Sequence, residues 1–277
     1  MADLTHPPTA SVSFVQIRPN GASLLAQALI NWASRNGRRP PWRASADLYE
    51  LAVAEILLQK TKAGDVEPVW LHLIDAYATA SELADASSDT VRDIVKCLGL
   101  GRQRTARLLA VARALVTTGL EAATGIGPYG RAILALSANA RPEGPPVDGN
   151  MARVITRLLG LKFERGEARK KPEVKRAVEE LLASCRRRPE KLALVYAMVD
   201  LGQAVCRPAH PNCAACPLLP RCAYAALCSV GQFKIGDDHL HLTTYIRGST
   251  APLRRVAEVR EVYGGAVADV LNEQGER

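Results

Sequence analysis

The sequence lacks any apolar run near the roughly 18 residues that a membrane helix requires. Its densest apolar stretch, which starts at Leu51, is interrupted by Glu55. The first residues also lack a basic segment followed by an apolar one, the pattern of a secretory signal. We therefore expect a cytoplasmic protein that is not exported and does not associate with membranes.

Apolar residues as such are not scarce. They make up 48% of the 277 residues, and charged residues make up 23%. This balance excludes a disordered chain, a collagen and a coiled coil, and it allows a core to form without disulfide staples. The length predicts one or two domains.

Acidic residues are the scarce charges, since 36 Lys and Arg stand against 28 Asp and Glu, for a net charge of +8. The segment 101–118 has four arginines and no acid, and 164–191 has ten basic and six acidic residues, whereas 229–277 has six basic and seven acidic ones. The positive charge therefore belongs to the first 228 residues. It indicates a polyanionic partner, although solvated helix faces would give the same composition.

Strand patterns are missing before residue 239, where a weakly alternating stretch begins. Apolar residues recur instead at helical spacing, interrupted by glycine and proline. The expected helices cover 21–36, 47–62, 66–77, 88–97, 102–116, 129–139, 150–159, 172–184 and 189–203, with Gly64 separating the second from the third. The sequence predicts an all-α protein with a separate tail from residue 229.

Four of the seven cysteines lie within 17 residues, at Cys206, Cys213, Cys216 and Cys222. A disulfide framework is not expected in a chain that is not exported. Zinc sites usually combine two C-x2-C pairs, and only one such pair is present here. The compact run favours a 4Fe–4S cluster with one thiolate per iron, with zinc or inert thiols as the alternatives. Outside the run, Cys97 and Cys185 are expected in helix cores, and Cys228 is expected to be a bystander.

Two Gly-x-Gly turns precede expected helices, at Gly125 to Gly127 and at Gly99 to Gly101. Successive backbone N–H groups at a helix N-terminus can hold a phosphate oxygen without reading sequence. The same turns also serve simply to end a helix.

Two carboxylates stand out. Glu55 lies among apolar residues of an expected helix, where burial would raise its pKa, or where it is only a satisfied residue at the edge of a core. Asp148 lies between Val147 and Gly149 and is either a functional carboxylate or a helix cap.

The order of Gly-x-Gly turn, Asp148 and four clustered cysteines resembles the helix–hairpin–helix DNA glycosylases of the endonuclease III superfamily, over about residues 21–228. The cysteine spacing is that superfamily's own. PWR at Pro41 and VDGNMARV at Val147 look like the adenine glycosylases. AEILLQKTKAGDV at Ala54 and GIGPYG at Gly125 look more like the archaeal thymine glycosylases that act on G·T mismatches.

The resemblance implies two helical domains with a DNA-binding cleft between them. One is a helical barrel domain with the helix–hairpin–helix, residues 44–140. The other is a 4Fe–4S cluster domain built from 21–43 and 141–228. A flexible segment, 1–20, would precede them, and a small C-terminal extension, 229–277, would follow.

The resemblance also implies roles for single residues. Asp148 falls on the catalytic aspartate, and Tyr129 falls where bifunctional members place a lysine that forms a Schiff base with the sugar. Glu55 matches a pocket glutamate that hydrogen-bonds the target base or a water. The residues implied in DNA binding are Gln59 and Lys60 as the wedge behind the flipped base, Gly125 and Gly127 as the phosphate-binding hairpin, and Arg207 and Arg221 beside the cluster.

The resulting hypothesis is a base-excision-repair glycosylase that hydrolyses the N-glycosidic bond of a flipped thymine or uracil opposite guanine. It binds double-stranded DNA as a monomer, at the nucleoid in a prokaryote, and lacks efficient strand cleavage because residue 129 has no amine. One alternative is an adenine glycosylase acting opposite 8-oxoguanine, for which the tail of about 49 residues is too short to supply the recognition domain. Another is a non-catalytic Fe–S DNA-binding protein, against which the presence of Glu55 and Asp148 argues.

Overall fold

The computed structural model describes residues 19–119, 124–163 and 166–229, and within these residues it contains helices and no strand. The all-α prediction is therefore confirmed, while the weakly alternating stretch after residue 239 lies outside the described residues. None of the helices searched in this part of the chain is long and apolar enough to span a membrane.

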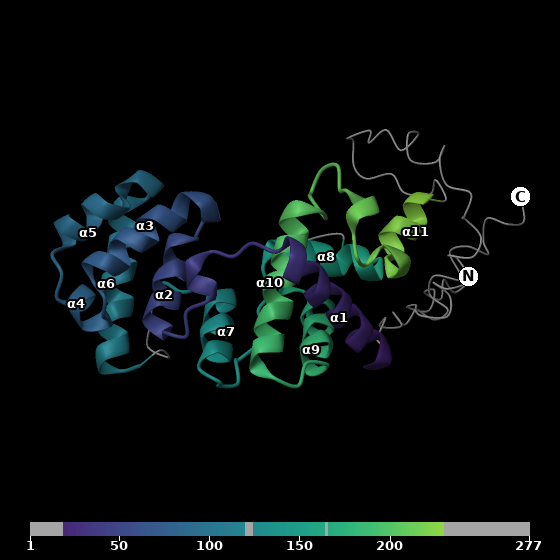
Figure 1. Cartoon of the computed structure of the whole chain (residues 1–277), viewed down its shortest axis with the longest axis horizontal. Helices are drawn as coiled ribbons and strands as arrows, with labels where there is room; N and C mark the ends of the chain where they lie inside the picture. Colours follow the sequence, from purple (N-terminus) through teal and green to yellow (C-terminus); the bar gives the residue numbers. More distant parts are fainter. Residues whose placement is uncertain (1–18, 120–123, 164–165, 230–277) are drawn as a thin grey trace, which may run out of the picture.

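One set of helices packs around a hydrophobic core on the left of Figure 1. It comprises α2 (Leu48–Leu57), α3 (Ala63–Ala76), α4 (Ala80–Ala84), α5 (Ser88–Val95) and α6 (Gly101–Thr117), with the 3-10 turns η1 (Pro41–Arg43) and η2 (Lys96–Leu98). Leu57, Leu73 and Leu83 are fully buried in this core. Trp42 and Trp70 meet edge to face, with ring centroids 5.9 Å apart.

A second set forms another core on the right of Figure 1. It comprises α1 (Pro19–Asn36), α8 (Gly149–Leu159), α9 (Pro172–Ala183), α10 (Arg188–Ala204) and α11 (Ala223–Ser229), with the 3-10 turns η4 (Ala168–Lys170), η5 (Cys213–Ala215) and η6 (Leu219–Arg221). α10 packs against both α1 and α8. Leu29, Ile155 and Met198 are among its fully buried side chains.

Helix α7 (Pro128–Ser137) lies between the two sets and contacts α2 on one side and α10 on the other. Its consecutive residues Ile133 and Leu134 are both fully buried, but Ile133 belongs to the core of α8–α10 and Leu134 to the core of α2–α6. Because one helix supplies side chains to both cores, it fixes how far apart the facing helices lie.

The break after α2 differs from the expectation. The helix ends at Leu57 rather than at Lys62, and Gly64 lies inside α3. The cause is Arg104, whose guanidinium binds the carbonyl oxygens of Ile56 and Leu57 at 2.9 and 2.6 Å and so replaces the helical donors that would follow.

Two further expectations differ from the structure or fall short of it. Cys97 is exposed rather than buried in a helix core, because the chain leaves α5 for η2 at this point, whereas Cys185 is buried as expected. The short helix α4 was not anticipated; its N-cap is Thr79, whose side chain forms a capping box with Glu82.

Candidate active site

A cavity of about 910 Å³ opens between the two sets of helices. Its walls come from α2 and the 58–62 loop, from the 125–127 turn and α7, and from η1, the start of α8 and α10. The predicted site residues that line it are Glu55, Gln59, Lys60, Gly125, Gly127, Tyr129 and Asp148. Segments almost a hundred residues apart in the chain therefore meet in one hollow, which is large enough for a nucleobase and sugar.

Glu55 projects from α2 into this cavity and is half-buried. Burial, and to a lesser extent the negative charge of Asp148, raises the pKa of its carboxyl to about 7, against the opposing positive charge of Arg43. A carboxyl with this pKa exists in both protonation states near neutral pH, which suits a group that exchanges protons or hydrogen-bonds in either sense.

Asp148 is the N-cap of α8. One carboxylate oxygen accepts a hydrogen bond from the backbone N–H of Met151 at 2.7 Å, and the other accepts one from the Asn150 side chain at 2.9 Å. Arg153 in turn donates to the Asn150 oxygen at 2.9 Å and to the Cys206 carbonyl at 2.8 Å. The carboxylate is thus held as an acceptor at a helix N-terminus, and a chain of hydrogen bonds joins it to the cysteine loop.

Two tyrosines face the same carboxylates. Burial, together with Glu55 and Asp148, raises the pKa of Tyr129 well above its usual value. Burial and Glu55 raise the pKa of Tyr196, on α10, to about 12. Both phenols therefore stay protonated and act as hydrogen-bond donors in the cavity.

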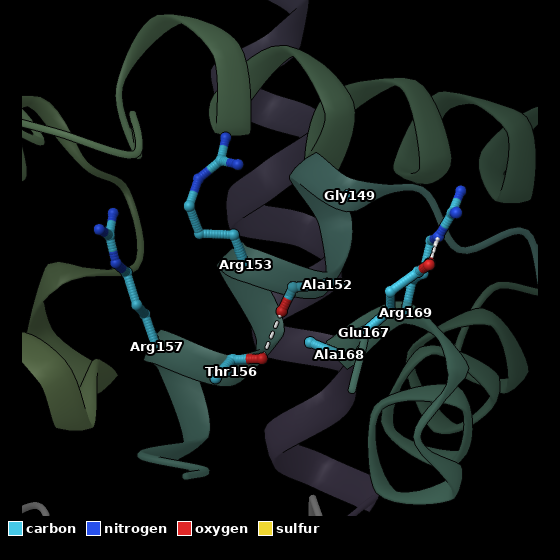
Figure 2. Close-up of a pocket in the computed structure, with 8 residues that line it drawn as sticks. All are labelled: Gly149, Ala152, Arg153, Thr156, Arg157, Glu167, Ala168 and Arg169. Carbon is cyan, nitrogen blue, oxygen red and sulfur yellow. Dashed lines mark hydrogen bonds and ion pairs between the residues drawn. The ribbon is translucent and has the colours of Figure 1, made fainter. Parts of the chain in front are cut away.

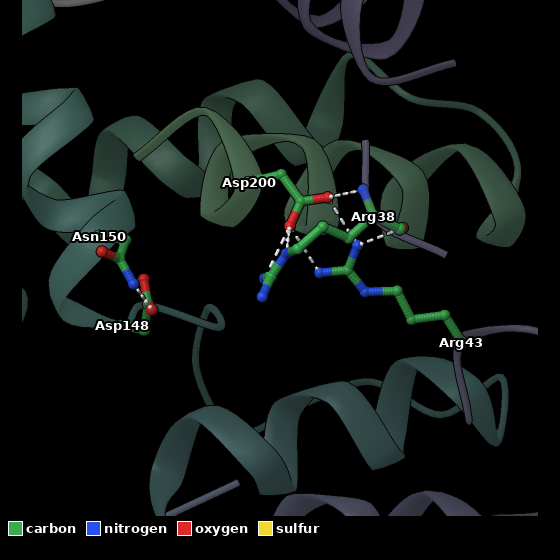
Figure 3. A network of polar contacts seen from close by, with 5 residues as sticks. All are labelled: Arg38, Arg43, Asp148, Asn150 and Asp200. Atoms are coloured by element: carbon green, nitrogen blue, oxygen red, sulfur yellow. Dashed lines mark hydrogen bonds and ion pairs between the residues drawn. The ribbon is translucent and has the colours of Figure 1, made fainter. Parts of the chain in front are cut away.

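Arg43 and Arg38 converge on Asp200, whose side chain is only 3% exposed (Figure 3). Arg43 binds both carboxylate oxygens of Asp200, at 2.7 and 3.0 Å, and its guanidinium lies 4.4 Å from the centre of the Tyr196 ring. Burial would raise the pKa of Asp200, but the hydrogen bonds and charges of Arg43 and Arg38 outweigh it, so the pKa is lowered. The two arginines and the one aspartate together leave one net positive charge at the cavity wall.

The two glycines of the 125–127 turn differ in whether their surroundings and backbone require glycine. Gly125 has a φ of +92°, and a Cβ there would lie 2.8 Å from Arg107 Cγ. Gly127 has ordinary extended backbone and open space around it, and it is the N-cap of α7. The turn therefore leaves its backbone uncovered at a helix N-terminus, an arrangement that suits a phosphate.

Gln59 is held within the protein rather than projecting from it. Its amide nitrogen donates to the Gly125 carbonyl at 2.8 Å, and its amide oxygen accepts a hydrogen bond from Arg107. Lys60 is the exposed tip of the loop and has a left-handed backbone with φ of 58°. Of the two predicted wedge residues, Lys60 is therefore the more exposed one.

The buried side chain of Arg104 holds the 58–62 loop in place through hydrogen bonds. Its side chain is buried at 4% exposure, and besides Ile56 and Leu57 it binds Thr61 at 3.0 Å and the Leu98 carbonyl at 3.3 Å. It thereby joins the 58–62 loop to the second Gly-x-Gly turn, whose central residue, Leu100, is 53% exposed with φ of 54°. The exposed residues Lys60 and Leu100 thus belong to two neighbouring turns that the buried guanidinium of Arg104 joins.

The four clustered cysteines line a second cavity, together with Tyr224 and Leu219. Burial, together with the neighbouring thiols, raises the pKa of Cys216 to about 11 and that of Cys222 to about 12. In the described part of the chain, no three His, Cys, Asp or Glu side chains lie close enough together to bind one metal ion. Four thiolates in this cavity would require compensating positive charge.

Two arginines of α8, one turn apart, extend toward the cysteine loop (Figure 2). Arg153 binds the carbonyl oxygens of Gly202 and Cys206, and Arg157 binds those of Arg207 and Pro208 and approaches the Cys206 sulfur at 3.4 Å. Both arginines line a pocket beside α8, and Arg169, paired with Glu167, lines the opposite side of that pocket.

Arg207 and Arg221 are not among the residues that line the large cavity. Arg207 is exposed and donates to the His210 carbonyl at 3.0 Å, and Arg221 is half-buried in η6. The structure thus gathers seven of the predicted residues in one cavity and leaves these two in the cysteine loop. It also adds Arg43 and Tyr196 to the cavity, with Asp200 bound to Arg43, and the only sequence signal for these residues was the PWR triplet that contains Arg43.

Comparison with known proteins agrees with this geometry. Residues 53–184 match the family model described as HhH-GPD superfamily base excision DNA repair protein. A thymine-DNA glycosylase of Aeropyrum pernix is 29% identical over 72% of this chain and 93% of its own length. An adenine DNA glycosylase of Mycobacterium tuberculosis is 28% identical over 83% of this chain and 78% of its own length.

The solved structures agree in fold. A thermostable thymine-DNA glycosylase superposes with a TM-score of 0.63 at 24% identity and covers 74% of this chain and 97% of its own. An endonuclease III in non-covalent complex with DNA superposes with a TM-score of 0.56 at 17% identity and covers 74% of this chain and 96% of its own. Residues 53–184 of this chain therefore match the HhH-GPD superfamily of base excision DNA repair proteins, and the fold of the described residues agrees with that match.

Proposed function

We propose that the protein is a DNA glycosylase that hydrolyses the N-glycosidic bond of a thymine or uracil mispaired with guanine. The observation that carries this proposal is the single cavity in which Glu55, Tyr129 and Asp148 meet. A base inside a duplex is out of reach of such a cavity, so the nucleotide must first rotate out of the helix.

Asp148 supplies the negative charge that the reaction needs. As the bond between the sugar C1′ and the base nitrogen breaks, positive charge develops on the sugar. A carboxylate fixed by Met151 and Asn150 stabilises that charge and accepts a proton from the water that attacks C1′. The base departs with the bonding electrons, and Arg43 in the cavity wall lowers the energy of its negative charge.

Glu55 contacts the flipped base. Below about pH 7 its carboxyl carries a proton and can donate a hydrogen bond to a carbonyl oxygen of a pyrimidine. Above that pH it is ionised and repels those oxygens. Base release is therefore expected to decline as the pH rises through about 7.

Tyr129 leaves the reaction without a covalent step. A lysine amine can attack C1′ and form a Schiff base that leads to strand cleavage, but a phenol that stays protonated cannot. The product is then an abasic site in an intact strand.

The choice of thymine or uracil rests on the relatives. Besides the Aeropyrum protein, one named thymine/uracil-DNA glycosylase, from Pyrobaculum aerophilum, is 29% identical over 69% of this chain. The adenine reading is the second candidate, favoured by the relative of 28% identity and by a Glu55 carboxyl that can protonate a purine nitrogen.

A 4Fe–4S cluster is the cofactor that fits the cysteine cavity. The four cysteines line one cavity, but within the described residues no three of them lie close enough together to bind a single ion, whereas a cubane takes one thiolate at each of four separated irons. Cys206, Cys213, Cys216 and Cys222 would hold it, and Arg157 would donate a hydrogen bond to the Cys206 sulfur. Bound there, the cluster would fix the shape of a loop with little regular structure. An as-purified protein with about four irons and four sulfides per chain is the expected result, and stoichiometric zinc would contradict it.

One panel of duplexes tests the function. End-labelled duplexes with G·T, G·U, A·8-oxoguanine and G·C pairs are incubated with the full chain, and each sample is split between alkali and neutral loading. We expect alkali-dependent cleavage at T or U opposite G, with no cleavage without alkali. Release of adenine alone would establish the second candidate, and no release from any duplex would refute the glycosylase.

Borohydride separates the covalent from the hydrolytic route. The same G·U duplex is incubated with sodium borohydride, which reduces a Schiff base to a stable cross-link. We expect no cross-link above the level of the Tyr129→Phe variant. A strong cross-link would contradict the hydrolytic mechanism while leaving base release itself intact.

A further inference from the structure

Gly130 is the third residue of α7. Because it has no side chain, it leaves a gap in the surface of the helix. A Cβ at this position would lie 2.9 Å from Glu55 Oε2 and 3.4 Å from Glu55 Cγ. The first distance is shorter than a Cβ and an oxygen tolerate. The Glu55 carboxylate, which comes from α2, therefore rests directly against the backbone of α7.

The backbone itself does not require glycine at this position. Gly130 lies inside α7 and is not among the residues with positive φ. Glycine within a helix lowers its stability relative to alanine, so an ordinary helical position would favour alanine. The reason for glycine is the space that its neighbours occupy.

We infer that Gly130 is a positioning residue for base release: the gap at Gly130 receives the Glu55 carboxylate and holds it on the α7 side of the cavity. This inference rests on the proposed function for its kinetic consequence, but the contact itself can be tested without any activity.

The groups around Glu55 explain why its position matters. Asp148 at the start of α8 repels the carboxylate, and Arg43 of η1 attracts it. The charge of Glu55 also raises the pKa of two phenols, Tyr129 of α7 and Tyr196 of α10. A side chain at position 130 would push the carboxylate out of the gap, toward the open cavity, where water would reach it and lower its pKa.

A second contact must be separated from this one. The same Cβ would lie 2.7 Å from Ile126 Cγ2, in the Gly-x-Gly turn. Gly130 could therefore be required only because the turn packs on α7. Replacement of Ile126 by alanine removes the methyl group in question and leaves Glu55 in place.

A double-mutant cycle on thermal unfolding distinguishes the two contacts. We expect Gly130→Ala to lower the Tm of the full-length holoprotein by about 5 °C. In the Glu55→Ala background the loss should shrink by at least half, because the carboxylate is gone, and in the Ile126→Ala background at least half of it should persist. A loss that vanishes with Ile126→Ala and persists with Glu55→Ala would overturn the inference.

The pH dependence of base release gives the second readout. Single-turnover rates on a G·U duplex are measured from pH 5 to 9 for the wild type, Gly130→Ala and Gly144→Ala, which adds a methyl group where nothing lies within 4 Å. We expect Gly130→Ala to lose at least 10-fold in rate and to shift the midpoint of the profile down by about one pH unit, with Gly144→Ala unchanged. A Gly130→Ala profile with the wild-type midpoint would contradict the inference.

The two readouts keep failures apart. If the wild type releases no base from any duplex, the proposed function fails while the thermal cycle still decides whether Glu55 occupies the gap. If the wild type is active but Gly130→Ala matches it in both Tm and pH profile, the proposed function stands and the inference falls. If Gly130→Ala does not accumulate as folded protein, recovery of folded protein in Gly130→Ala/Glu55→Ala supports the inference, and failure to recover it counts against it.

Discussion

The two walls of the large cavity hold their carboxylates in opposite ways. On the wall of α2 and α7, Glu55 is half-buried, and its pKa is raised to about 7 by burial and by Asp148. Behind the wall of η1 and α10, Asp200 is more deeply buried, yet its pKa is lowered because Arg43 and Arg38 hydrogen-bond to it. Burial alone thus does not decide the protonation state; bonded cations do.

The contrast assigns different work to the two walls. The α10 wall fixes permanent charges, a carboxylate and two guanidiniums, in one geometry. The α2 wall holds a group that changes its charge near neutral pH. Asp148 is likewise held in one geometry, by N–H donors at the start of α8.

The largest effect is expected for Asp148→Asn. Asparagine still accepts the hydrogen bond from Met151 and keeps the cap of α8, but it removes the negative charge beside the sugar. Base release from a G·U duplex should fall by about 1,000-fold or more, roughly 4 kcal/mol of transition-state stabilisation, while DNA affinity is retained. Single-turnover kinetics and a gel-shift titration check this. A variant with half the wild-type rate would remove Asp148 from the chemistry.

Asp200→Asn should mainly affect stability. The change leaves Arg43 and Arg38 without their counter-charge in a buried site and should cost about 3 kcal/mol of unfolding free energy. Because the folded pKa of Asp200 is lowered, its stabilisation is present above the unfolded pKa of about 3.9 and is lost as the pH falls through the folded value. Urea unfolding at pH 7 and pH 3 should show a smaller difference between variant and wild type at the lower pH. An equal difference in unfolding free energy at pH 7 and pH 3 would show that the charge of Asp200 does not stabilise the protein, contrary to the contrast drawn with Glu55.

Glu55→Gln should lower the rate of base release by about 100-fold at pH 6 and flatten the pH dependence around 7. The sign for stability is opposite to that of Asp200. With a raised folded pKa, Glu55 costs stability as the pH rises from about 4.5 through about 7, so the variant should gain in Tm over the wild type at pH 8 but not at pH 4. A variant less stable than the wild type at pH 8 would show that Glu55 is bound by a cation after all.

The smallest effect concerns the loop that borders both walls. Lys60→Ala removes a charge from an exposed tip and should weaken binding to any duplex by about threefold, while the slope of log affinity against log salt falls by about 1. Gln59→Ala serves as the matched comparison, since it removes no charge and should leave that slope unchanged. A salt slope that does not move in Lys60→Ala would place this lysine away from phosphates.

Much of this arrangement could be predicted from the sequence. The helices from α5 to α10 begin and end within a few residues of the expected positions, because glycine, proline and capping residues mark their ends. Asp148 as a cap, Glu55 as a group with a raised pKa, and the convergence of both with Tyr129 follow from local chemistry and from the family pattern.

What the sequence could not supply were the contacts between distant segments. The premature end of α2 depends on Arg104, more than forty residues later in the chain. Arg43 appeared only as part of a triplet, because its partner Asp200 lies 157 residues away. The hydrogen bonds of Gln59 to Gly125 and Arg107, two residues far from it in the chain, likewise had no signal in the sequence.

Helix α7 has a consequence for how DNA enters the cavity. Ile133 of α7 packs in one core and Leu134 in the other. Separation of the two cavity walls would therefore pull a buried side chain out of one of these cores. On the proposed function, we therefore expect a duplex that bends and unstacks easily at the mispair to reach the carboxylates most readily.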